Sequence, residues 1–585
     1  MVWGLALDLG AADEALAPDV LASSVLPPAE FAADDAAAEA LFHDRTYFRS
    51  DKKGGYFALS PDIVRVRLKE REEEARKLVQ YNEMLAWLSE PTEGITQAAN
   101  QAFEVLQSFV LFEDGSEVSK TARQLIRDLF PNSSEPDIAL AFKVLVRHGV
   151  FRDDENLVFH RSGLPVAFSL GALRDAEIRS HTIVTSERRE DHRHLLTVAI
   201  DDRYTTEIDD ALSVESRSDG TWLVHVYIAD ASFFVLPGSP TDQDAFERAS
   251  TIYLPEGKVP MLPDCLSEDA ASLKSGVDRA AIDFSFTVDG EGNVLGFDIA
   301  EVLVNVNEHL SYGMSDELIA GTREHPLGEL VRTLFSLGEG VRARRRQGGS
   351  ITLDRQDTTV VVGENRIAQV TPWRTDDPSR RMVAEWMISA CTGAARWCYD
   401  HRIPTLYRAQ QPPDEPPQIP LDRPLRGFEL QRILRTMRKA ELSIEPLPHA
   451  GLGVEFYTQI TSPLRRYADL LMHRQIRSVL RTSRPYYSEN ELLQYFEQIE
   501  HITSQQRSIE RQSRRFWVLR RLEQNIGHKV EVEVVRQIGR RFVVDLLDWG
   551  VQCAWTPKRT PTVGDILPLT ISQVNARKDR IILAG

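Results

Sequence analysis

A short stretch of the chain gathers side chains whose type and spacing could bind a metal ion. The stretch is AIDDRYTTEIDDALSV, residues 199–214. Its acidic side chains fall within ten positions: Asp201, Asp202, Glu207, Asp209 and Asp210. Carboxylates packed together repel one another, so their pKa values rise unless a cation compensates for the charge. Hard oxygen ligands select magnesium, manganese or calcium over zinc. The pattern indicates either a solvated acidic turn or a divalent-cation site that could serve phosphate chemistry.

The spacing of these acids does not fit an EF-hand, the first alternative for an acidic calcium site. That loop requires oxygen ligands at its first, third and fifth positions and a glycine at its sixth. Counted from Asp201, the third and fifth positions are Arg203 and Thr205, and Thr206 stands where the glycine belongs. Magnesium together with a phosphate-containing substrate is therefore the more specific interpretation.

The elements around the acidic stretch must turn the chain so that its carboxylates can converge. HLLTVAI (194–200) alternates as a strand. Asp209 and Asp210 are adjacent, and a regular strand would point them to opposite faces. We therefore expect a turn before them and then a hairpin over ALSVESRSDGTWLVHVYIAD (211–230), which bends at its Asp-Gly pair.

Length and composition indicate a globular protein of several domains. The chain has 585 residues, of which 42% are hydrophobic and 27% charged. It contains no run of about eighteen apolar residues, so we expect no membrane span. Its N-terminus lacks basic residues before the short apolar part and makes a poor signal peptide. Four scattered cysteines without a CxxC pair fit a reducing cytoplasm and argue against a zinc site or a disulfide framework. We expect a cytoplasmic protein.

The charge of the chain is negative overall but unevenly placed. A net charge of −18 counts against a protein that simply coats nucleic acid. Residues 1–44 contain no Lys or Arg, whereas four basic clusters follow later in the chain: 341–349, 462–477, 507–521 and 536–541. A single basic run is usually a solvated helix face. Several runs in one half favour a basic channel, because local potential attracts a phosphate backbone.

The first third of the chain is expected to form three segments. Residues 1–45 are Ala-rich, acidic and interrupted by prolines, which suggests a weakly ordered extension or a docking arm. Residues 46–96 predict a short hairpin around Lys-Gly-Gly and a long helix, which Ser60 caps before Pro61. Residues 97–165 predict three helices and a β-hairpin, the order of a winged helix-turn-helix. Such a unit could contact RNA, or it could serve as a structural or autoinhibitory packing module.

The remaining chain is expected to form one large domain and a small barrel. Residues 166–525 alternate strands and helices without an internal repeat and predict an α/β domain. Residues 526–585 contain about five short strands with period-two patterning, which suggests an oligonucleotide-binding (OB) barrel. Arg540, Arg541 and Phe542 would supply charge and stacking surface for RNA there. A barrel used only for packing is the alternative.

Long strings downstream of the acidic stretch resemble the catalytic domain of a known family. They include YLPEGKVPMLPDCLS (253–267), HLSYG (309–313), IPTLYRAQ (403–410) and YTQITSPLRRYADLLMHR (457–474). In this order they are similar to the RNB catalytic domain of the ribonuclease II / ribonuclease R family of exoribonucleases, over roughly residues 190–525. The resemblance implies a multidomain protein with an α/β (α+β) catalytic domain. The N-terminal half departs from the family, which usually carries cold-shock-type barrels there.

The resemblance implies a magnesium-dependent hydrolase, with manganese as a substitute, that degrades single-stranded RNA processively from its 3′ end to 5′-mononucleotides. It implies roles in RNA turnover or processing, and we expect a monomer. The family's four aspartates fall on Asp201, Glu207, Asp209 and Asp210, so Glu207 is a departure. The resemblance implies Asp201 and Asp210 as main metal ligands, Asp209 as a ligand or water-orienting group, and Glu207 as a second-metal or water-mediated ligand. Asp202 is expected to lie outside the site.

The resemblance also implies residues that hold the RNA. Arg465, in SPLRRY, matches the family arginine expected at the scissile phosphate, where its guanidinium would offset developing charge. Arg466 is a further RNA-binding candidate or a structural ion-pair partner. Tyr312 and Tyr253 match tyrosines that stack on the terminal nucleotide and grip the 3′ end. Stacking tolerates any base, which suits an enzyme that degrades any RNA.

Three further residues fall on motif positions. Glu510 matches a glutamate near the terminal ribose, where it could accept from the 2′-hydroxyl. Its alternative role is a helical i,i+4 pair with Arg514. Arg408 is implied to contact RNA, and Arg408 and Glu385 are both implied to support the site. A second aromatic clamp is expected near GGSITLD (348–354), which contains no aromatic residue.

The histidines beside the motifs, His225 and His449, are expected to be structural rather than metal ligands. Two other functions stay open for the chain. One is an RNA-binding or regulatory protein on a degenerate catalytic scaffold, and the other is an endonuclease. Retention of the acidic set with Arg465, Tyr312 and Tyr253 favours the exonuclease.

Overall fold

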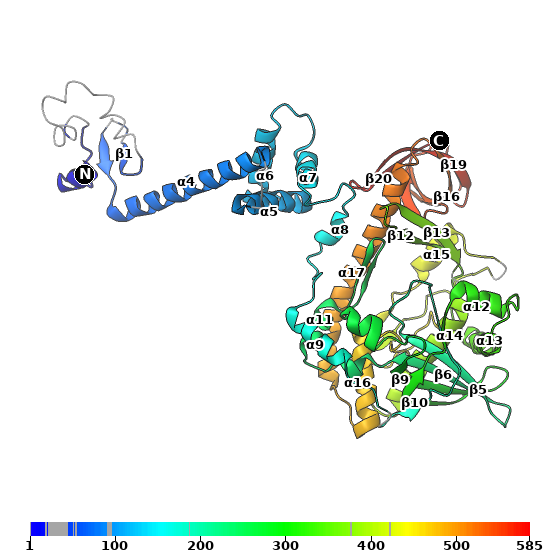
Figure 1. Cartoon of the computed structure of the whole chain (residues 1–585). Helices are drawn as coiled ribbons and strands as arrows, with labels where there is room; N and C mark the ends of the chain where they lie inside the picture. Colours follow the sequence, from blue (N-terminus) through cyan, green and yellow to red (C-terminus); the bar gives the residue numbers. More distant parts are fainter. Residues whose placement is uncertain are drawn as a thin grey trace. The chain divides into compact units, whose positions relative to one another are not determined.

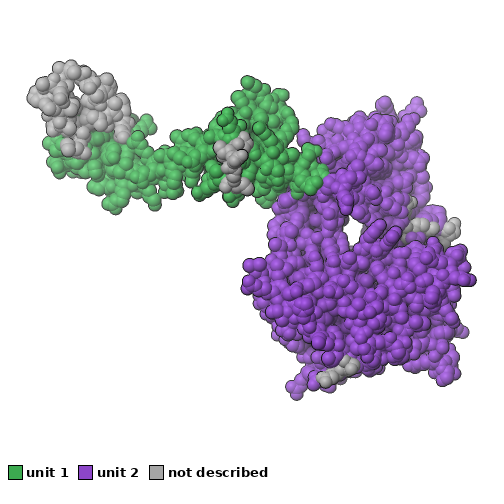
Figure 2. Space-filling view, in the orientation of Figure 1, with its two compact units in different colours: residues 1–155 green, residues 156–585 purple. Residues whose placement is uncertain are grey.

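The protein is described from a computed structural model, and its chain divides into two compact units. The structure describes residues 2–17, 20, 45–50, 52, 55–90, 96–185, 188–374, 377–420 and 423–585. The units comprise Met1–Glu155 and Asn156–Gly585 (Figure 2). Most of the extension expected over residues 1–45 lies outside the described residues.

The first unit contains a small hairpin, a long helix and a cluster of three helices (Figure 1). Its elements are α1 (Val2–Asp8), β1 (Phe48–Ser50), β2 (Tyr56–Ala58), α4 (Pro61–Ser89), α5 (Gln97–Phe112), α6 (Glu117–Leu129) and α7 (Asp137–Arg147). β1 pairs antiparallel with β2, and α1 packs on this hairpin. The expected hairpin and long helix are therefore present. α5, α6 and α7 pack together over completely buried apolar side chains, among them Leu106, Phe109 and Leu145.

The wing of the expected winged helix-turn-helix is absent from residues 150–165, all of which the structure describes. The chain makes a turn at 152–155 and then enters a short helix, α8 (Leu157–His160). Asn156 caps this helix, since its side chain accepts a hydrogen bond from the Val158 N–H. The Asn156 amide also donates to Ser513 Oγ at 2.7 Å. The prediction of two strands is wrong. Asn156 starts a helix at this point, and its side chain bonds to the distant helix that carries Ser513, so the segment does not form a hairpin.

A seven-stranded sheet forms the centre of the second unit. Its strands are β3 (Glu190–Asp191), β4 (Thr197–Asp201), β5 (Asp210–Ser216), β6 (Trp222–Ala229), β9 (Asp278–Val288), β10 (Val294–Asn305) and β11 (Glu308–Ser311). They lie in the order β11-β4-β5-β6-β9-β10-β3. The edge strands β11 and β3 run parallel to their neighbours, and the other pairs are antiparallel. The hairpin expected over 211–230 is β5–β6.

Helices and short hairpins surround this sheet. The helices after α8 are α9 (Leu170–Ser180), α10 (Ala231–Phe234), α11 (Pro240–Arg248), the π-helical turn η1 (Cys265–Ala270), α12 (Tyr312–Ile319), α13 (Gly328–Gln347), α14 (Pro378–Asp400), α15 (Gly427–Thr436), α16 (Tyr467–Thr482) and α17 (Glu489–Glu523). The hairpins are β7 (Ile252–Leu254) with β8 (Gly257–Val259), β12 (Gln356–Val362) with β13 (Ala368–Arg374), and β14 (Tyr407–Ala409) with β15 (Glu441–Ser443). α13 and α14 contact each other and the sheet, where Trp386 is completely buried. Among the described helices, none combines the length and apolar character that a bilayer crossing requires.

Five antiparallel strands at the C-terminus form a nearly closed barrel, which confirms the expected OB-like fold. They are β16 (Lys529–Ile538), β17 (Arg541–Leu546), β18 (Val551–Trp555), β19 (Ile566–Asn575) and β20 (Arg580–Ala584). The end strands β18 and β20 approach each other, and α17 runs from α16 to the barrel (Figure 1). Phe542 is 3% exposed and lies in the barrel core beside its cross-strand partner Trp555. The prediction that Phe542 stacks on RNA is therefore wrong, whereas Arg540 and Arg541 are exposed.

Candidate active site

The acidic stretch lies where two neighbouring strands of the central sheet meet. β4 ends at Asp201 and β5 begins at Asp210, and the antiparallel pairing of these strands brings the ends of the intervening turn together. On the other side of β4, the parallel strand β11 places Ser311 opposite Asp201. Tyr312 follows directly at the start of α12. The fold therefore positions the first and last aspartates of the motif and the expected stacking tyrosine at one edge of the sheet.

Three carboxylates of this stretch, the buried Asp209 and the partly buried Asp201 and Asp210, hold their protons more tightly than usual. Burial, then the charge of Asp209, raises the pKa of Asp201 to about 7. Burial likewise raises the pKa of Asp209 to about 6, against the opposing charge of Arg465. The pKa of Asp210 lies well above its usual value because of burial and the neighbouring Asp201. Desolvation and mutual repulsion thus exceed the compensation that Arg465 provides, and a divalent cation would relieve both.

Asp209 connects the acidic turn to the loop before α16. Its Oδ1 accepts the Leu464 N–H at 3.0 Å, and its Oδ2 accepts from Arg465 Nε at 3.0 Å. Arg465 Nη2 donates in turn to Ser462 Oγ at 2.8 Å. The Arg465 side chain is 40% exposed, so its guanidinium is accessible to a ligand while it contacts the acid.

The adjacent Arg466 is tied more firmly into the protein. Its Nη2 donates to Asp469 Oδ2 at 2.7 Å and to Thr461 Oγ1 at 3.2 Å. Asp469 is completely buried and also accepts the Ser462 N–H. This is the structural ion pair that the sequence left open as the alternative for Arg466.

Glu207 lies beside Tyr253. Its Oε2 accepts a hydrogen bond from Tyr253 Oη at 2.9 Å, and Lys258 Nζ lies 3.2 Å from its Oε1. Tyr253 and Lys258 are cross-strand partners in the hairpin β7–β8. Both oxygens of Glu207 therefore face this hairpin. The sequence analysis missed Lys258, although the register of the YLPEGKV hairpin would have placed it opposite Tyr253.

Tyr253 also contacts Glu510 on α17. The Tyr253 N–H donates to Glu510 Oε1 at 2.9 Å, and burial raises the pKa of Glu510. Arg514, the alternative partner of Glu510, instead donates to Asp357 Oδ1 at 3.1 Å. The motif position of Glu510 thus coincides with a contact to the hairpin that carries Tyr253.

A pocket of about 290 Å³ brings four of the eight expected RNA-binding residues together. The site residues in its wall are Tyr253, Arg408, Arg465, Arg466, Arg507 and Glu510. Burial, and then the charge of Arg507, lowers the pKa of Arg408, as expected where cations crowd together. Four guanidinium groups beside an aromatic ring suit a nucleotide and its phosphates. Glu385 is not in this wall, because it is buried in a bidentate pair with Arg345.

Tyr312 is covered by an arginine that the sequence analysis did not single out. The guanidinium carbon of Arg380 lies 4.0 Å from the centroid of the Tyr312 ring and 4.7 Å from that of Trp373. Arg380 also donates to Asp202 Oδ1 at 2.7 Å. Asp202 is thus paired with Arg380. A second aromatic residue was expected near residues 348–354, which contain none, and Trp373 is an aromatic residue close to Tyr312. The local sequence does not indicate this contact, because it joins distant parts of the chain.

The structure describes another candidate metal-binding group, His192, His225 and Asp283, away from the acidic stretch. In the part of the chain described, it is the one group of His, Cys, Asp and Glu with three ligand atoms within 4.8 Å of one another. His449, the other histidine beside a motif, accepts the Leu452 N–H and fits a structural role.

Comparisons with known proteins match this architecture. The RNB domain family model covers residues 189–419 and 422–482. A Synechocystis sp. protein named as an uncharacterized ribonuclease is 28% identical over 99% of this chain and 87% of its own length. Ribonuclease R of Thermotoga maritima is 30% identical over 50% of this chain and 46% of its own. Ribonuclease II, chloroplastic/mitochondrial, of Arabidopsis thaliana is 28% identical over 76% of this chain and 56% of its own length. The chain thus spans about half the length of the last two relatives.

Solved structures share the fold at lower sequence identity. An active-site mutant of the Dss1 exoribonuclease from Candida glabrata superposes with a TM-score of 0.73, at 18% identity over 91% of this chain and 73% of its own. Mycoplasma genitalium RNase R in complex with ribose-methylated single-stranded RNA gives a TM-score of 0.66, at 21% identity over 73% of this chain and 77% of its own. Together with the RNB domain and the ribonuclease relatives, these likenesses show that the chain belongs to the ribonuclease II / ribonuclease R family of RNB-domain proteins.

Proposed function

We propose that this chain is a magnesium-dependent hydrolytic exoribonuclease that releases 5′-mononucleotides from the 3′ end of single-stranded RNA. The observation that carries the proposal is the contact of Arg465 with Asp209, which puts a phosphate-binding cation directly on the acidic group. The same pocket contains Tyr253 and Glu510, groups suited to a base and a ribose. The names of the relatives, and the RNA in the Mycoplasma RNase R complex, support an RNA substrate. We further propose a cytoplasmic monomer that acts in RNA turnover or processing.

Asp201, Asp209 and Asp210 would hold the metal. Their raised pKa values express an excess of buried negative charge, which is the environment a hard divalent cation requires. Magnesium bound there would lower the pKa of a water molecule and stabilise the leaving oxygen. Glu207 would contribute by holding Tyr253, because its oxygens face Tyr253 and Lys258.

The side chains around the acids would position the RNA end. Arg465 would bind the nonbridging oxygens of the scissile phosphate, and Arg408 would bind a neighbouring phosphate. Water attacks the phosphorus and the bond to the 3′-oxygen breaks. The shortened strand keeps a 3′-hydroxyl and the released nucleotide keeps its 5′-phosphate. Tyr253 and Tyr312 would stack on bases, and Glu510 would accept from a 2′-hydroxyl.

The test compares linear single-stranded RNA with a circle of the same sequence, with and without magnesium. We expect mononucleotides from the linear RNA only, and only with the metal. Rapid cutting of the circle would show an endonuclease instead. Asp209→Asn keeps the shape of the side chain but removes its charge. It should lower turnover by about 10²–10³ or more, the cost of losing one transition-state-stabilising group, and leave RNA binding intact.

A second candidate is an RNA-binding protein on a degenerate catalytic scaffold. It is favoured by the departure at Glu207, whose oxygens are engaged by Tyr253 and Lys258. Yeast Ssd1, described as a pseudonuclease, shares the fold with a TM-score of 0.53 at 17% identity, over 75% of this chain and 59% of its own. In that case the wild-type protein would bind RNA and release no nucleotide, and Asp209→Asn would change neither property.

A further inference from the structure

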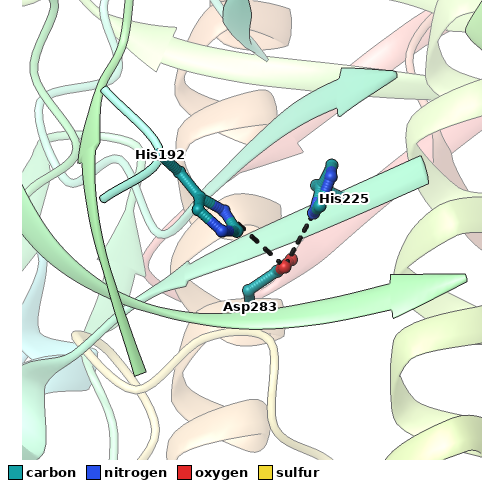
Figure 3. A group of neighbouring side chains, drawn as sticks. All are labelled: His192, His225 and Asp283. Atoms are coloured by element: carbon teal, nitrogen blue, oxygen red, sulfur yellow. Dashed lines mark hydrogen bonds and ion pairs between the residues drawn. The ribbon is translucent and has the colours of Figure 1, made fainter. Parts of the chain in front are cut away.

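His192, His225 and Asp283 form a cluster in which both histidine side chains lie beside the Asp283 carboxylate (Figure 3). Asp210 is the cross-strand partner of Ile228 on β6, three residues after His225. Side chains alternate between faces along a strand, so residues three apart point in opposite directions. The His225 side chain therefore points away from the face that carries Asp210.

Three elements bring the cluster together. His225 and Tyr227 point to the same face of β6, and Asp283 on β9 is the cross-strand partner of Tyr227. His192 follows the edge strand β3, and its N–H donates to Leu303 O on β10 at 2.9 Å. A ligand bound here would therefore join an edge of the sheet to its middle.

The distances within the cluster fit a small cation. His225 Nδ1 lies 2.7 Å from Asp283 Oδ2, and His192 Nδ1 lies 3.9 Å from the same oxygen. Tyr227 Oη closes another side, 3.2 Å from His192 Nδ1. Ligand atoms about 2.0–2.1 Å from a tetrahedral zinc ion lie about 3.3 Å from one another. The His192 ring would have to move closer to Asp283, and His225 would have to move slightly away from it, to meet this geometry.

The outer nitrogens of both rings face carboxylates. His225 Nε2 lies 3.3 Å from Glu215 Oε1, and His192 Nε2 lies 3.5 Å from Glu190 Oε2. A metal-binding histidine almost always donates its second N–H to such an acceptor, which leaves the other nitrogen unprotonated. Without metal, His225 Nδ1 donates to Asp283 Oδ2. With a metal bound, Glu215 and Glu190 would accept the Nε2 protons, and both Nδ1 atoms would be free to bind the ion.

Asp283 provides an independent sign that the cluster binds a cation. Its side chain is 2% exposed, and Oδ1 has no hydrogen-bond partner among the described residues. Leaving a buried carboxylate oxygen unsatisfied costs about 1–3 kcal/mol or more. A metal ion bound by both oxygens of the Asp283 carboxylate would satisfy Oδ1 as well as Oδ2.

We propose that His192, His225 and Asp283 form a structural site for a zinc-class transition metal, closed by the hydroxyl of Tyr227. Two imidazoles and one carboxylate suit zinc, whereas magnesium prefers oxygen ligands alone. The site is buried, as structural zinc sites are, and it would fix β3 against β6 and β9. It is independent of the exonuclease proposal and of the scattered cysteines.

The test measures metal in the untagged full-length protein by elemental analysis. We expect about one zinc per chain, lost in His192→Gln and Asp283→Asn. The zinc should be kept in His449→Gln, a buried histidine outside the cluster, and in Asp209→Asn. Zinc returned to the chelator-treated wild type should raise its Tm by several degrees with a one-to-one endpoint, and magnesium should not reproduce that endpoint.

Two results would overturn the proposal. One is a wild-type protein without zinc and without a zinc-induced rise in Tm, which would leave His225 and Asp283 as an ordinary buried pair. The other is full zinc content in the folded His192→Gln protein. Because His192 is the most exposed member of the cluster, this variant keeps the test informative if Asp283→Asn does not fold. Cobalt bound to the wild type should also give the absorption bands of a tetrahedral site, and their absence would count equally against it.

Discussion

At the scale of single residues, the active-site candidates are defined by how their charges are paired. Asp209 is hydrogen-bonded to Arg465, whereas at Asp201 and Asp210 burial and the neighbouring aspartates outweigh the charge of Arg465. Glu207 belongs to a different local network, with Tyr253 and Lys258. One acidic motif thus serves two purposes: the aspartates form a site of excess negative charge, and the glutamate orients an aromatic residue.

The Glu207–Tyr253 contact predicts that the two residues act as a unit. A hydrogen bond to a charged group contributes about 1.5–3 kcal/mol. Tyr253→Phe and Glu207→Gln should therefore each raise KM by about tenfold, with a smaller change in kcat. The double variant should be no worse than either single one, which a double-mutant cycle on RNA hydrolysis would measure. Glu268→Gln is the control, because Glu268 pairs with Lys258 at 2.6 Å and has no hydrogen bond to Tyr253 in the described structure. Fully additive effects would contradict the prediction.

The raised pKa values of Asp201 and Asp209, about 7 and about 6, predict how pH and magnesium combine. The ordinary value is about 4. A carboxyl with a raised folded-state pKa contributes stability below its ordinary pKa and loses it as pH rises through the folded value. Without metal, the contribution of these groups to the free energy of unfolding should fall between about pH 4 and pH 7.

Magnesium binds the ionised carboxylates, so its effect should follow the same titration. The magnesium-induced rise in Tm should be larger near about pH 8 than near about pH 5.5. Thermal unfolding of the wild type at both pH values would measure it, with Asp209→Asn as the control for nonspecific ion effects. An equal rise at both pH values, or the same response in the variant, would speak against metal binding by these acids.

At the scale of elements, sequence patterns predicted secondary structure correctly where it depends on the residues of a single strand or helix. Alternation predicted β4 and the hairpin β5–β6, and Pro61 correctly marked the first residue of α4, although the Ser60 side chain does not make the expected capping hydrogen bond. The patterns failed where contacts with distant parts of the chain determine the local structure. The segment after α7 has β-forming residues, yet Asn156 starts a helix and bonds to Ser513 on α17. Phe542 follows two exposed arginines, but its strand turns the ring into the barrel.

The double role of Asn156 can be tested by comparing two helix caps. Asn156→Ala removes the cap of α8 and the bonds to Ser513 and Glu256. Thr96→Ala removes the cap of α5, which bonds to the Ala99 N–H. Loss of a cap costs about 1 kcal/mol. The Thr96 variant should lose about that much free energy of unfolding, and the Asn156 variant about 2–3 kcal/mol. Urea unfolding measures both, and an equal loss would mean that the bonds to Ser513 and Glu256 add nothing.

At the scale of the whole molecule, residues separated by hundreds of positions become neighbours. The sequence could predict that Asp209, Arg465 and Glu510 belong to one site, because the motifs around them resemble a known family. It could not predict that Arg465 rests on Asp209, or that Arg380 bridges Asp202, Tyr312 and Trp373, because these contacts depend on how distant elements pack. The motifs thus predicted which residues belong to the site, whereas the contacts between these residues could be seen only in the folded structure.

The division into two units predicts which part of the chain carries the chemistry. Every candidate catalytic and RNA-binding residue lies in Asn156–Gly585, which has its own sheet and barrel cores. Removal of Met1–Glu155 should therefore change kcat and KM on short single-stranded RNA by less than about threefold, since effects below about 0.7 kcal/mol are typical of sites without direct contact. Asp209→Asn in the shortened chain controls for contaminating nuclease. A loss of more than tenfold would show that the first unit takes part in catalysis.

The same pair of proteins, assayed on a hairpin RNA with a 3′ overhang, would separate two roles for the three-helix cluster. If the shortened chain loses activity on the hairpin RNA only, the cluster acts on structured RNA. If its rates on both RNAs are unchanged, the cluster is a packing module.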